Sequence, residues 1–355
     1  MAESQTFQYY IMTLPRFIEK LVERRSLTQE EAREAMRAIL AGEAGEIQMA
    51  AFLTALRMKG ETVDELVGFA RAIREKAAPV EVGVEGPLLD TCGTGGDSAG
   101  TFNISTVAAF VVAGAGVRVA KHGNRSITSQ CGSADLLEAL GIQIAIPPAE
   151  SARAIREIGI GFLFAPAVHS AMKHAQPVRR ALKIRTAFNL LGPLTNPAGA
   201  SAQIAGAPSP EAAELIAGAL AALGLKRGFV VHGSDGLDEI TTTGPTLAFE
   251  IRDGRVERRT LEPADFAVPE ASPADLKGGD VACNAGIARA ILAAERGPRR
   301  DIVLANAAAG LVAAEKVETF LEGMALGAES IDSGAARGKL EELAAFGRAI
   351  RTEAP

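Results

Sequence analysis

The chain has 355 residues, a formal net charge of −6 at pH 7, 48% hydrophobic residues and 23% charged residues, the balance of a folded α/β protein rather than a disordered one. The negative charge argues against nucleic-acid binding, because a phosphate backbone would be repelled unless a local basic patch dominated. Three widely spaced cysteines without a C-x-x-C pair predict neither a disulfide framework nor a cysteine zinc site. A signal sequence and an 18-residue apolar run are both missing, so we expect a cytoplasmic protein that does not span a membrane.

The first part of the chain, from about residue 14 to 78, is predicted to be all-helical. Apolar residues recur there at three- and four-residue spacing, which is typical of amphipathic helices. Two capping signatures, at 28–31 and 62–65, mark the beginnings of helices. The stretch 45–53 between them is rich in small and apolar residues and suits close helix packing or a subunit contact.

From residue 88 onward, short β-type runs alternate with helical stretches, which predicts parallel βαβ units. An Asp253-Gly254 pair between two further β-type runs predicts a hairpin, so the sheet should be mixed. The fold class is therefore α/β, with a small helical domain beside a larger domain whose mostly parallel sheet is flanked by helices. The expected strands are 88–90, 117–119, 203–205 and 228–231, and the expected helices are 105–116, 133–140, 210–223 and those from about 284 on.

A glycine-rich loop, DTCGTGGD at 90–97, follows the first of these strands and precedes TFNIST at 101–106. Glycines let the backbone approach an anion closely, and the N-terminus of the next helix offers unpaired N–H groups. Neither a P-loop nor a dinucleotide fingerprint fits, because no G-K-[ST] follows and Ser98 replaces the third glycine of G-x-G-x-x-G. The loop predicts a phosphate or pyrophosphate site; a tight strand-to-helix turn is the alternative.

A basic segment, KHGNRS at 121–126, follows the next expected strand, at the edge where a parallel sheet presents its carboxyl ends. Lys121 and Arg125 could hold phosphate charge, and Asn124 could orient a neutral polar substrate. A solvated basic loop is the alternative interpretation.

A third loop rich in glycine and serine, at 129–133, precedes another expected helix. Ser133 is predicted to be its N-cap, with Asp135 in the first turn. Capping alone would explain both residues, but a ligand role is favoured because this loop too lies before a helix N-terminus.

An acidic pair, Asp238 and Glu239, ends the glycine-containing loop HGSDGLDE at 232–239. Mg²⁺ binds one or two protein carboxylates together with phosphate oxygens and water, so this pair predicts a magnesium site; a solvated acidic pair is the alternative. The four histidines have no zinc-binding spacing, so no metal is assigned to them.

Six motifs, taken together and in this order, resemble the anthranilate phosphoribosyltransferase family. The resemblance runs from the helical start nearly to the C-terminus and implies a homodimer joined through its helical domains. It also implies a helical domain at 1–80, joined by helices from about 165–200, and a phosphoribosyl pyrophosphate (PRPP)-binding α/β domain at 81–164 and 201–355. The motifs are GTGGD at 93–97, TFNIST at 101–106, KHGNR at 121–125, GSAD at 132–135, RTAFNLLGPLTNP at 185–197 and HGSDGLDEI at 232–240.

The resemblance also assigns residues to ligands. Many relatives have glycine in place of Ser98 and Lys-Ser in place of Gln130 and Cys131, so side-chain contacts from these positions should differ here. The residues expected at PRPP are Gly93, Gly95, Gly96, Asp97, Thr101, Asn103, Ser105, Thr106, Lys121 and Ser133; at Mg²⁺ Ser105, Asp238 and Glu239; and at anthranilate Gly93, Asn124, His169 and Arg179. The residues expected to act in catalysis are Lys121, Asn124 and Arg179.

The implied activity is transfer of the 5-phosphoribosyl group from PRPP to the amine of anthranilate, with release of pyrophosphate, in tryptophan biosynthesis. A pyrimidine nucleoside phosphorylase resembles this family in fold, but the acidic pair and the His169 and Arg179 pocket favour the transferase. A non-catalytic relative that binds nucleic acid is the other alternative, and it would need a basic face that a net charge of −6 does not suggest.

Overall fold

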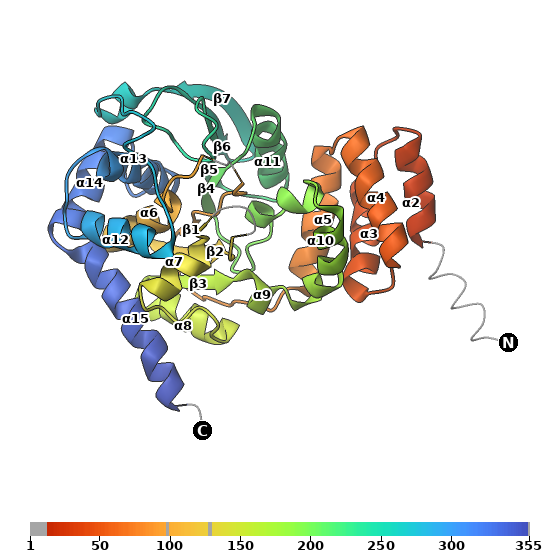
Figure 1. The fold of residues 1–355 in the computed structure, drawn as a ribbon, viewed down its shortest axis with the longest axis horizontal. Helices are drawn as coiled ribbons and strands as arrows, with labels where there is room; N and C mark the ends of the chain where they lie inside the picture. Colours follow the sequence, from red (N-terminus) through yellow and green to blue (C-terminus); the bar gives the residue numbers. More distant parts are fainter. Residues whose placement is uncertain (1–12, 97–98, 127–129, 354–355) are drawn as a thin grey trace.

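A computed structural model describes residues 13–96, 99–126 and 130–353. A bundle of helices lies on one side of the molecule and a larger body built on a sheet lies on the other (Figure 1). Within the described residues, no helix is long and apolar enough to cross a membrane. The bundle consists of α2 (Thr13–Val22), α3 (Gln29–Ala41), α4 (Glu46–Lys59) and α5 (Val63–Lys76).

The two capping boxes that the sequence predicts are confirmed. Thr28 and Thr62 each accept a hydrogen bond from the backbone N–H three residues on, and each N3 glutamate accepts one from the cap residue in return. These bonds satisfy donors that a helix N-terminus otherwise leaves open.

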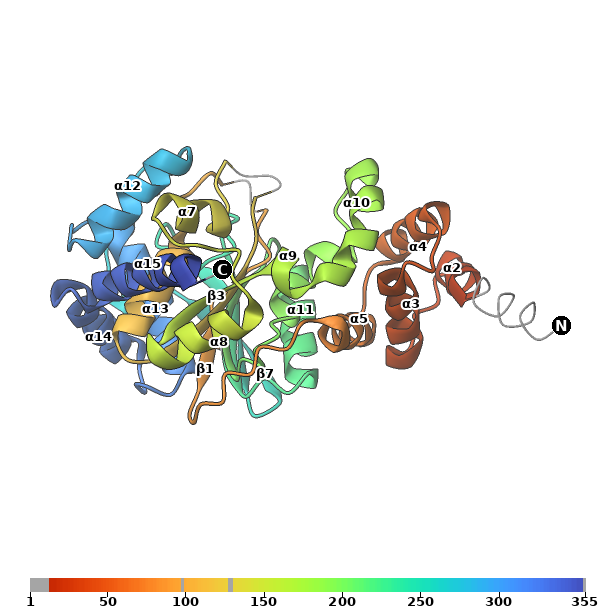
Figure 2. The same cartoon turned by 90° about the horizontal axis from the view of Figure 1, so that it is seen from below.

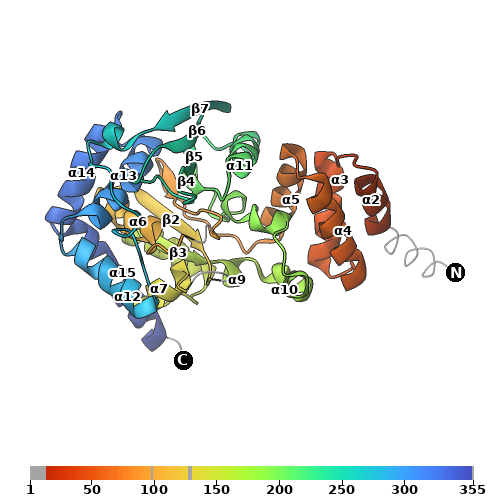
Figure 3. The same cartoon turned by 45° about the horizontal axis from the view of Figure 1, so that its top comes forward.

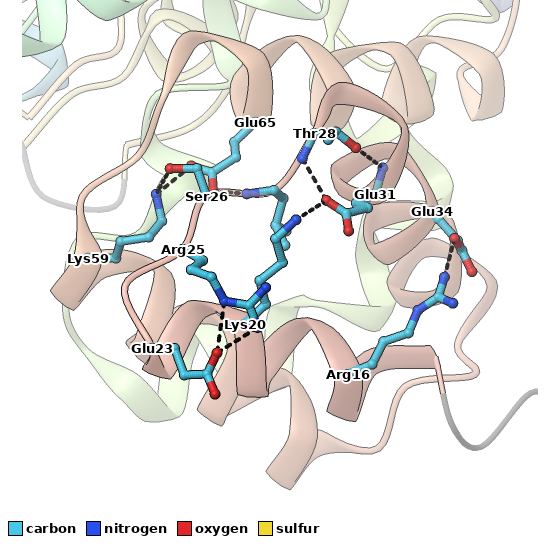
Figure 4. A network of polar contacts seen from close by, with 11 residues as sticks. Arg16, Lys20, Glu23, Arg25, Ser26, Thr28, Glu31, Glu34, Lys59 and Glu65 are labelled. Carbon is cyan, nitrogen blue, oxygen red and sulfur yellow. Dashed lines mark hydrogen bonds and ion pairs between the residues drawn. The ribbon is translucent and has the colours of Figure 1, made fainter.

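One of these N3 residues, Glu65, is also half of a buried ion pair inside the bundle (Figure 4). Its carboxylate accepts hydrogen bonds from the backbone N–H groups of Leu27 and Thr62, both at 2.9 Å, and from Nζ of Lys59 at 3.0 Å. The side chain of Glu65 is 0% exposed and that of Lys59 is 5% exposed. A charge so far from water is stable only when its oxygens are satisfied in this way.

The larger body contains a seven-stranded sheet in the order β3-β2-β1-β4-β5-β6-β7. The first five strands in this order are mutually parallel, whereas β6 runs antiparallel to both of its neighbours, β5 and β7, so the predicted mixed sheet is confirmed. Asp253 and Gly254 form the hairpin turn with positive φ angles of 48° and 78°, as a type I′ turn requires. The strands are β1 (Leu88–Asp90), β2 (Arg118–Gly123), β3 (Ile160–Phe164), β4 (Ala202–Gly206), β5 (Arg227–Gly233), β6 (Thr246–Arg252) and β7 (Arg255–Leu261).

Helices cover both faces of this sheet, and alternate residues of the strands point to opposite faces. Val231 of β5 packs in the core of one face, whereas Val230 packs with α11 on the other. The first face carries α6 (Ile104–Gly114), α7 (Ser133–Ala139), α12 (Val281–Leu292), α13 (Pro298–Ala313), α14 (Phe320–Asp332), α15 (Ala335–Glu353) and η4 (Pro263–Phe266), and the second carries α8 (Pro148–Glu157) and α11 (Pro210–Ala222).

A series of short helices leads from β3 back to the bundle. Among them, η1 packs on α3 and α10 packs on α4. Figures 2 and 3 show α10 next to the bundle. One continuous apolar cluster joins Phe52 of the bundle, Val178 of α10 and Ile216 of α11. This packing supports a helical module that residues from the middle of the chain complete, although the predicted domain boundaries stay a prediction. The short helices are α9 (Ala165–Val168), η1 (Ser170–His174), α10 (Gln176–Leu182), η2 (Ala187–Asn189) and η3 (Gly192–Leu194).

Candidate active site

The strand order reverses between β1 and β4, since β2 and β3 lie on one side of β1 and β5 lies beyond β4. At such a switch point the loops from the carboxyl ends of neighbouring strands diverge, and α/β proteins bind ligands there. The glycine-rich loop follows β1, the basic segment includes the end of β2, and the acidic pair follows β5. The fold therefore brings three of the predicted motifs to one edge of the sheet.

The glycine loop approaches the end of β4 closely. The N–H of Thr94 donates to the carbonyl of Gly206 at 2.9 Å, and a Cβ added to Gly93 would lie 3.1 Å from the nitrogen of Gly206. Gly95 and Gly96 have φ angles of 67° and 81°, in the left-handed region that side chains disfavour. The glycines are thus explained by backbone geometry. Asp97 lies outside the described residues.

The acidic pair contacts both the loop and the helix that follows it. Oδ2 of Asp238 accepts from the N–H of Gly95 at 2.7 Å, and Oε1 of Glu239 accepts from the N–H of Ser105 at 3.1 Å. Ser105 lies in the first turn of α6, where N–H groups have no partner within the helix. The predicted phosphate loop and the predicted metal ligands are therefore direct neighbours.

Asn306 of α13 fixes the chain just after the acidic pair. Its Oδ1 accepts from the N–H of Ile240 at 3.0 Å, and its Nδ2 donates to the carbonyl of Ile240 at 2.9 Å. A buried amide that satisfies both groups of one residue holds that residue in place. Asn306 was not predicted, because no local motif marks a partner 66 residues away along the chain.

The residues of 101–106 hold the start of α6 against neighbouring segments. Asn103 donates through Nδ2 to the carbonyl of Cys131 at 3.0 Å and accepts from Asn284 at 3.2 Å. Thr101 forms an isolated bridge with Lys277, while Thr106 is buried. These contacts position the segment, and its predicted role at PRPP stays a prediction.

Lys121 is buried beneath the glycine loop. Its Nζ donates to the carbonyl and to the hydroxyl oxygen of Thr91, both at 3.0 Å, and burial lowers its pKa. Asp90 is also buried, and this burial raises the pKa of its carboxyl to about 6. The Asp90 carboxylate accepts from the N–H of His122 and from Nδ2 of Asn196. Asp90 and Asn196 lie within the motifs at 90–97 and 185–197, but neither was assigned a role from the sequence.

The loop after β2 contacts the start of α7. Oγ of Ser133 donates to the carbonyl of Asn124 at 3.1 Å, and Arg125 forms ion pairs with Asp135 and Glu138. The Arg125 guanidinium is therefore engaged by carboxylates. The prediction that Ser133 is the N-cap was wrong: the cap is the preceding glycine, whose N–H donates to Asp135, and Ser133 is the first helical residue.

Two buried histidines lie side by side next to this loop. The rings of His122 and His169 are 5.1 Å apart at 75°, an edge-to-face arrangement. Burial lowers the pKa of His122 to about 3 and that of His169 to about 4, so both are neutral at pH 7. Nε2 of His122 is buried without a hydrogen-bond partner in the described structure.

Arg179 of α10 is half-buried. Its guanidinium carbon lies 5.1 Å from the centre of the Phe188 ring, and burial lowers its pKa. Stacking on an aromatic ring orients a guanidinium without using its N–H donors. The predicted anthranilate residues His169 and Arg179 come from neighbouring short helices of the segment that returns to the bundle.

Comparison with known proteins identifies the family. Residues 85–337 match the "Glycosyl transferase family, a/b domain", and residues 15–77 match the "Glycosyl transferase family, helical bundle domain". An anthranilate phosphoribosyltransferase of Solibacter usitatus is 72% identical over 336 residues, which are 94% of this chain and 99% of that protein. The chain belongs to the anthranilate phosphoribosyltransferase family.

Solved structures of the anthranilate phosphoribosyltransferase family have the same architecture. The enzyme of Thermus thermophilus is 47% identical, with a TM-score of 0.89 over 94% of this chain and 99% of that one. The Saccharomyces cerevisiae enzyme in complex with PRPP and Mg is 29% identical, with a TM-score of 0.87 over 95% and 98% of the two chains. The family resemblance and the fold class predicted from the sequence are confirmed.

Proposed function

We propose that this chain transfers the 5-phosphoribosyl group of PRPP to the amine of anthranilate and releases pyrophosphate, as a step of tryptophan biosynthesis. The acidic pair contacts the glycine loop and the N-terminus of α6. This contact is the main support for placing the reaction at this edge of the sheet. A loop and a helix terminus suited to phosphate, beside two carboxylates suited to a divalent cation, form a site for a metal-bound pyrophosphate. Family membership favours this function over the phosphorylase and the nucleic-acid-binding alternatives.

The donor atoms at the acidic pair fit Mg²⁺. Asp238 and Glu239 are half-buried, and they offer carboxylate oxygens next to the hydroxyl-bearing residue Ser105. Hard oxygen donors of this kind suit Mg²⁺, which usually keeps several waters and shares phosphate oxygens with its substrate. These three residues would hold the ion. When bound, Mg²⁺ supplies positive charge that neutralises the pyrophosphate.

The glycine loop and α6 are proposed to bind the PRPP phosphates. Backbone N–H groups of the loop face the anion, and Ser133 and the 101–106 segment contribute further polar groups. Lys121 lies beneath the loop, and its ammonium donates to Thr91. A buried cation there favours negative charge on the leaving group without contacting solvent.

Anthranilate is proposed to lie against Asn124, His169 and Arg179. The guanidinium fork of Arg179 matches a carboxylate in geometry and charge. The anthranilate amine is neutral at pH 7 and attacks C1 of the ribose, which gains oxocarbenium character as its bond to the pyrophosphate oxygen breaks. The proton that the amine then loses passes to the released pyrophosphate or to water. Catalysis then depends on positioning, on charge neutralisation and on exclusion of water, without a strong base.

We further propose that the chain acts in the cytoplasm as a homodimer joined through the helical bundle. Large apolar side chains are exposed on this bundle: Ile47 and Met58 of α4 are 87% and 73% exposed, and Val22 of α2 is 68% exposed. Ile47 and Met58 are eleven residues, close to three helical turns, apart on α4, so they lie on the same side of this helix. An exposed apolar face is typical of an interface. Light scattering of the wild type and of an Ile47→Asp variant measures whether a dimer forms and whether this surface joins it.

The loss of anthranilate fluorescence in the presence of PRPP and MgCl₂ tests the proposed reaction. We expect a loss that requires both additions and that is strongly slowed in Arg179→Ala and in the double variant Asp238→Asn/Glu239→Gln. No loss under any condition contradicts the transferase. Phosphorolysis of uridine or thymidine, and salt-dependent binding of single-stranded DNA, would then test the two alternatives.

A further inference from the structure

Arg185 contacts the glycine loop at a different residue from the acidic pair. Its Nη1 donates to the carbonyl of Gly96 at 3.1 Å. The atoms nearest to a Cβ added at Gly96 are those of the Arg185 guanidinium, at 3.6 to 3.8 Å. The loop is thus held at two consecutive residues, by Asp238 at the N–H of Gly95 and by Arg185 at the carbonyl of Gly96.

The backbone of Arg185 belongs to the segment that carries Arg179. Lys183, with a φ of 52°, ends α10, and Arg185 follows two residues later. Immediately afterwards the chain turns into η2, where Phe188 is buried in the apolar core of the helical module. Because Arg179 lies over the Phe188 ring, both arginines are anchored on one short folded unit.

The Arg185 guanidinium is available to the loop. Its side chain is exposed, and its guanidinium donates to the Gly96 carbonyl. The neighbouring cations differ, because Arg125 is engaged by Asp135 and Glu138, and Lys121 is buried against Thr91. A guanidinium that donates to a backbone carbonyl forms a charge-assisted hydrogen bond, which restricts the glycine that carries this carbonyl.

We propose that Arg185 is a positioning residue for PRPP, which fixes the glycine loop through the Gly96 carbonyl and ties it to the segment carrying Arg179. This inference rests on the proposed function. If so, one segment of the chain sets the binding geometry at both substrates. Arg179 faces the anthranilate carboxylate, and Arg185 holds the loop that binds the PRPP phosphates. Because Arg185 acts through the loop backbone, its removal affects PRPP binding more than the chemical step.

Kinetics of three variants test this role. Arg185→Ala should raise the KM for PRPP roughly tenfold, as expected for losing a charge-assisted hydrogen bond, and should change kcat by less than about threefold. Arg185→Lys keeps one donor and should restore part of the KM. Arg180→Ala is the matched control, because Arg180 is an exposed arginine of α10 that loses the same charge, and it should behave like the wild type.

Binding of PRPP with MgCl₂, measured by calorimetry, and the melting temperature complete the test. We expect weaker PRPP binding by Arg185→Ala with a melting temperature equal to that of Arg180→Ala. Equal PRPP binding by these two variants overturns the role of Arg185, as does a lowered melting temperature with an unchanged KM. If the wild type binds PRPP but transfers no phosphoribosyl group, the proposed function is contradicted, while the binding measurements still test Arg185. If the wild type does not bind PRPP, the proposed function and the role of Arg185 are both overturned.

Discussion

Asp238 accepts a hydrogen bond from the backbone N–H of Gly95 through Oδ2, at 2.7 Å. Glu239 makes a similar contact with the N–H of Ser105, which lies in the first turn of α6. One N–H group cannot donate fully to a carboxylate and to a phosphate oxygen at once. We expect PRPP bound at these N–H groups, as proposed above, to displace the two carboxylates toward a cation, which would couple the two binding events.

This coupling predicts the effect of removing one charge. Asp238→Asn keeps the shape of the side chain but halves the charge of the acidic pair, which weakens its hold on a divalent cation. We expect kcat/KM for PRPP to fall about 10²-fold at limiting MgCl₂, with partial recovery as the MgCl₂ concentration rises. Initial rates over a series of MgCl₂ concentrations measure this.

The control for that variant is Asp253→Asn. Asp253 lies in the hairpin turn between β6 and β7, beside the opposite end of β5, and asparagine tolerates its positive φ. It removes the same charge far from the site and should leave the MgCl₂ dependence unchanged. If the two variants gave the same MgCl₂ dependence, the acidic pair would not be the metal site.

Gly206→Ala tests the packing beneath the acidic pair. A Cβ at this position would lie 1.6 Å from the carbonyl oxygen of Asp238, so the 238–239 segment must move. We expect a loss of about 1–3 kcal/mol in the free energy of unfolding, together with a higher MgCl₂ requirement, because the carboxylates move with their backbone. Urea unfolding and the same rate assay measure both effects.

Gly286→Ala is the matched control for this variant. Gly286 is exposed within α12, and nothing lies within 4 Å of an added Cβ. Alanine is favoured over glycine in a helix interior, so this change should increase stability by about 0.5–1 kcal/mol. An activity loss in Gly206→Ala without any change in stability or MgCl₂ requirement would contradict the packing argument.

The elements that the sequence predicted well are those with a local cause. The Asp253-Gly254 turn, the Thr28 and Thr62 capping boxes and the alternation of strands with helices all depend on residues within a few positions of one another. Strand β3 was missed, because a short apolar run such as IGFLF cannot be told from a buried helical segment by periodicity. The N-cap of α7 was misplaced by one residue, since glycine there lacks the side chain that usually marks a cap.

The site was predictable only as a set of loops. Glycine content and charge identified the loops at 93–97 and 238–239, but the residues that hold them lie far away along the chain. Asn196 meets Asp90 across 106 residues, and Arg185 meets Gly96 across 89. Such pairs arise from the strand order, which brings β1 and β4 together, and no local pattern encodes them.

The histidine pair predicts a pH dependence of stability. His122 and His169 have pKa values lowered by burial from 6.5 to about 3 and about 4 in the folded chain. The unfolded chain therefore binds protons at these side chains below pH 6.5 while the folded chain does not, so the two histidines lower the stability as the pH drops from 6.5 toward 4. Each histidine contributes a slope of about 1.4 kcal/mol per pH unit near pH 5.

Urea unfolding at several pH values between 4.5 and 7.5 measures this slope. In the double variant His122→Asn/His169→Asn, the change in the free energy of unfolding per pH unit near pH 5 should decrease by the contribution of both histidines. His174→Asn is the control, because it removes a histidine outside this pair. A double variant as acid-sensitive as the wild type would mean that the histidines are already charged in the folded chain.

The buried ion pair of the helical bundle predicts a large effect on stability. Glu65→Gln leaves the buried ammonium of Lys59 without its counter-charge and weakens the acceptor shared by Leu27 and Thr62. Breaking one partner of a buried pair costs about 3–5 kcal/mol. Urea unfolding of the bundle should therefore shift strongly, while the rate of the enzyme that remains folded should not change, because the pair is not part of the site.

Glu34→Gln gives the exposed counterpart of the same change, since Glu34 pairs with Arg16 on the surface of the bundle with 44% and 58% of the side chains exposed (Figure 4). An exposed pair contributes about 0–1 kcal/mol, so this variant should unfold near the wild-type urea concentration. Equal shifts in the two variants would show that burial does not set the strength of the Lys59 pair. A loss of catalytic rate in folded Glu65→Gln would instead reveal that the bundle transmits strain to α10, which packs on α4.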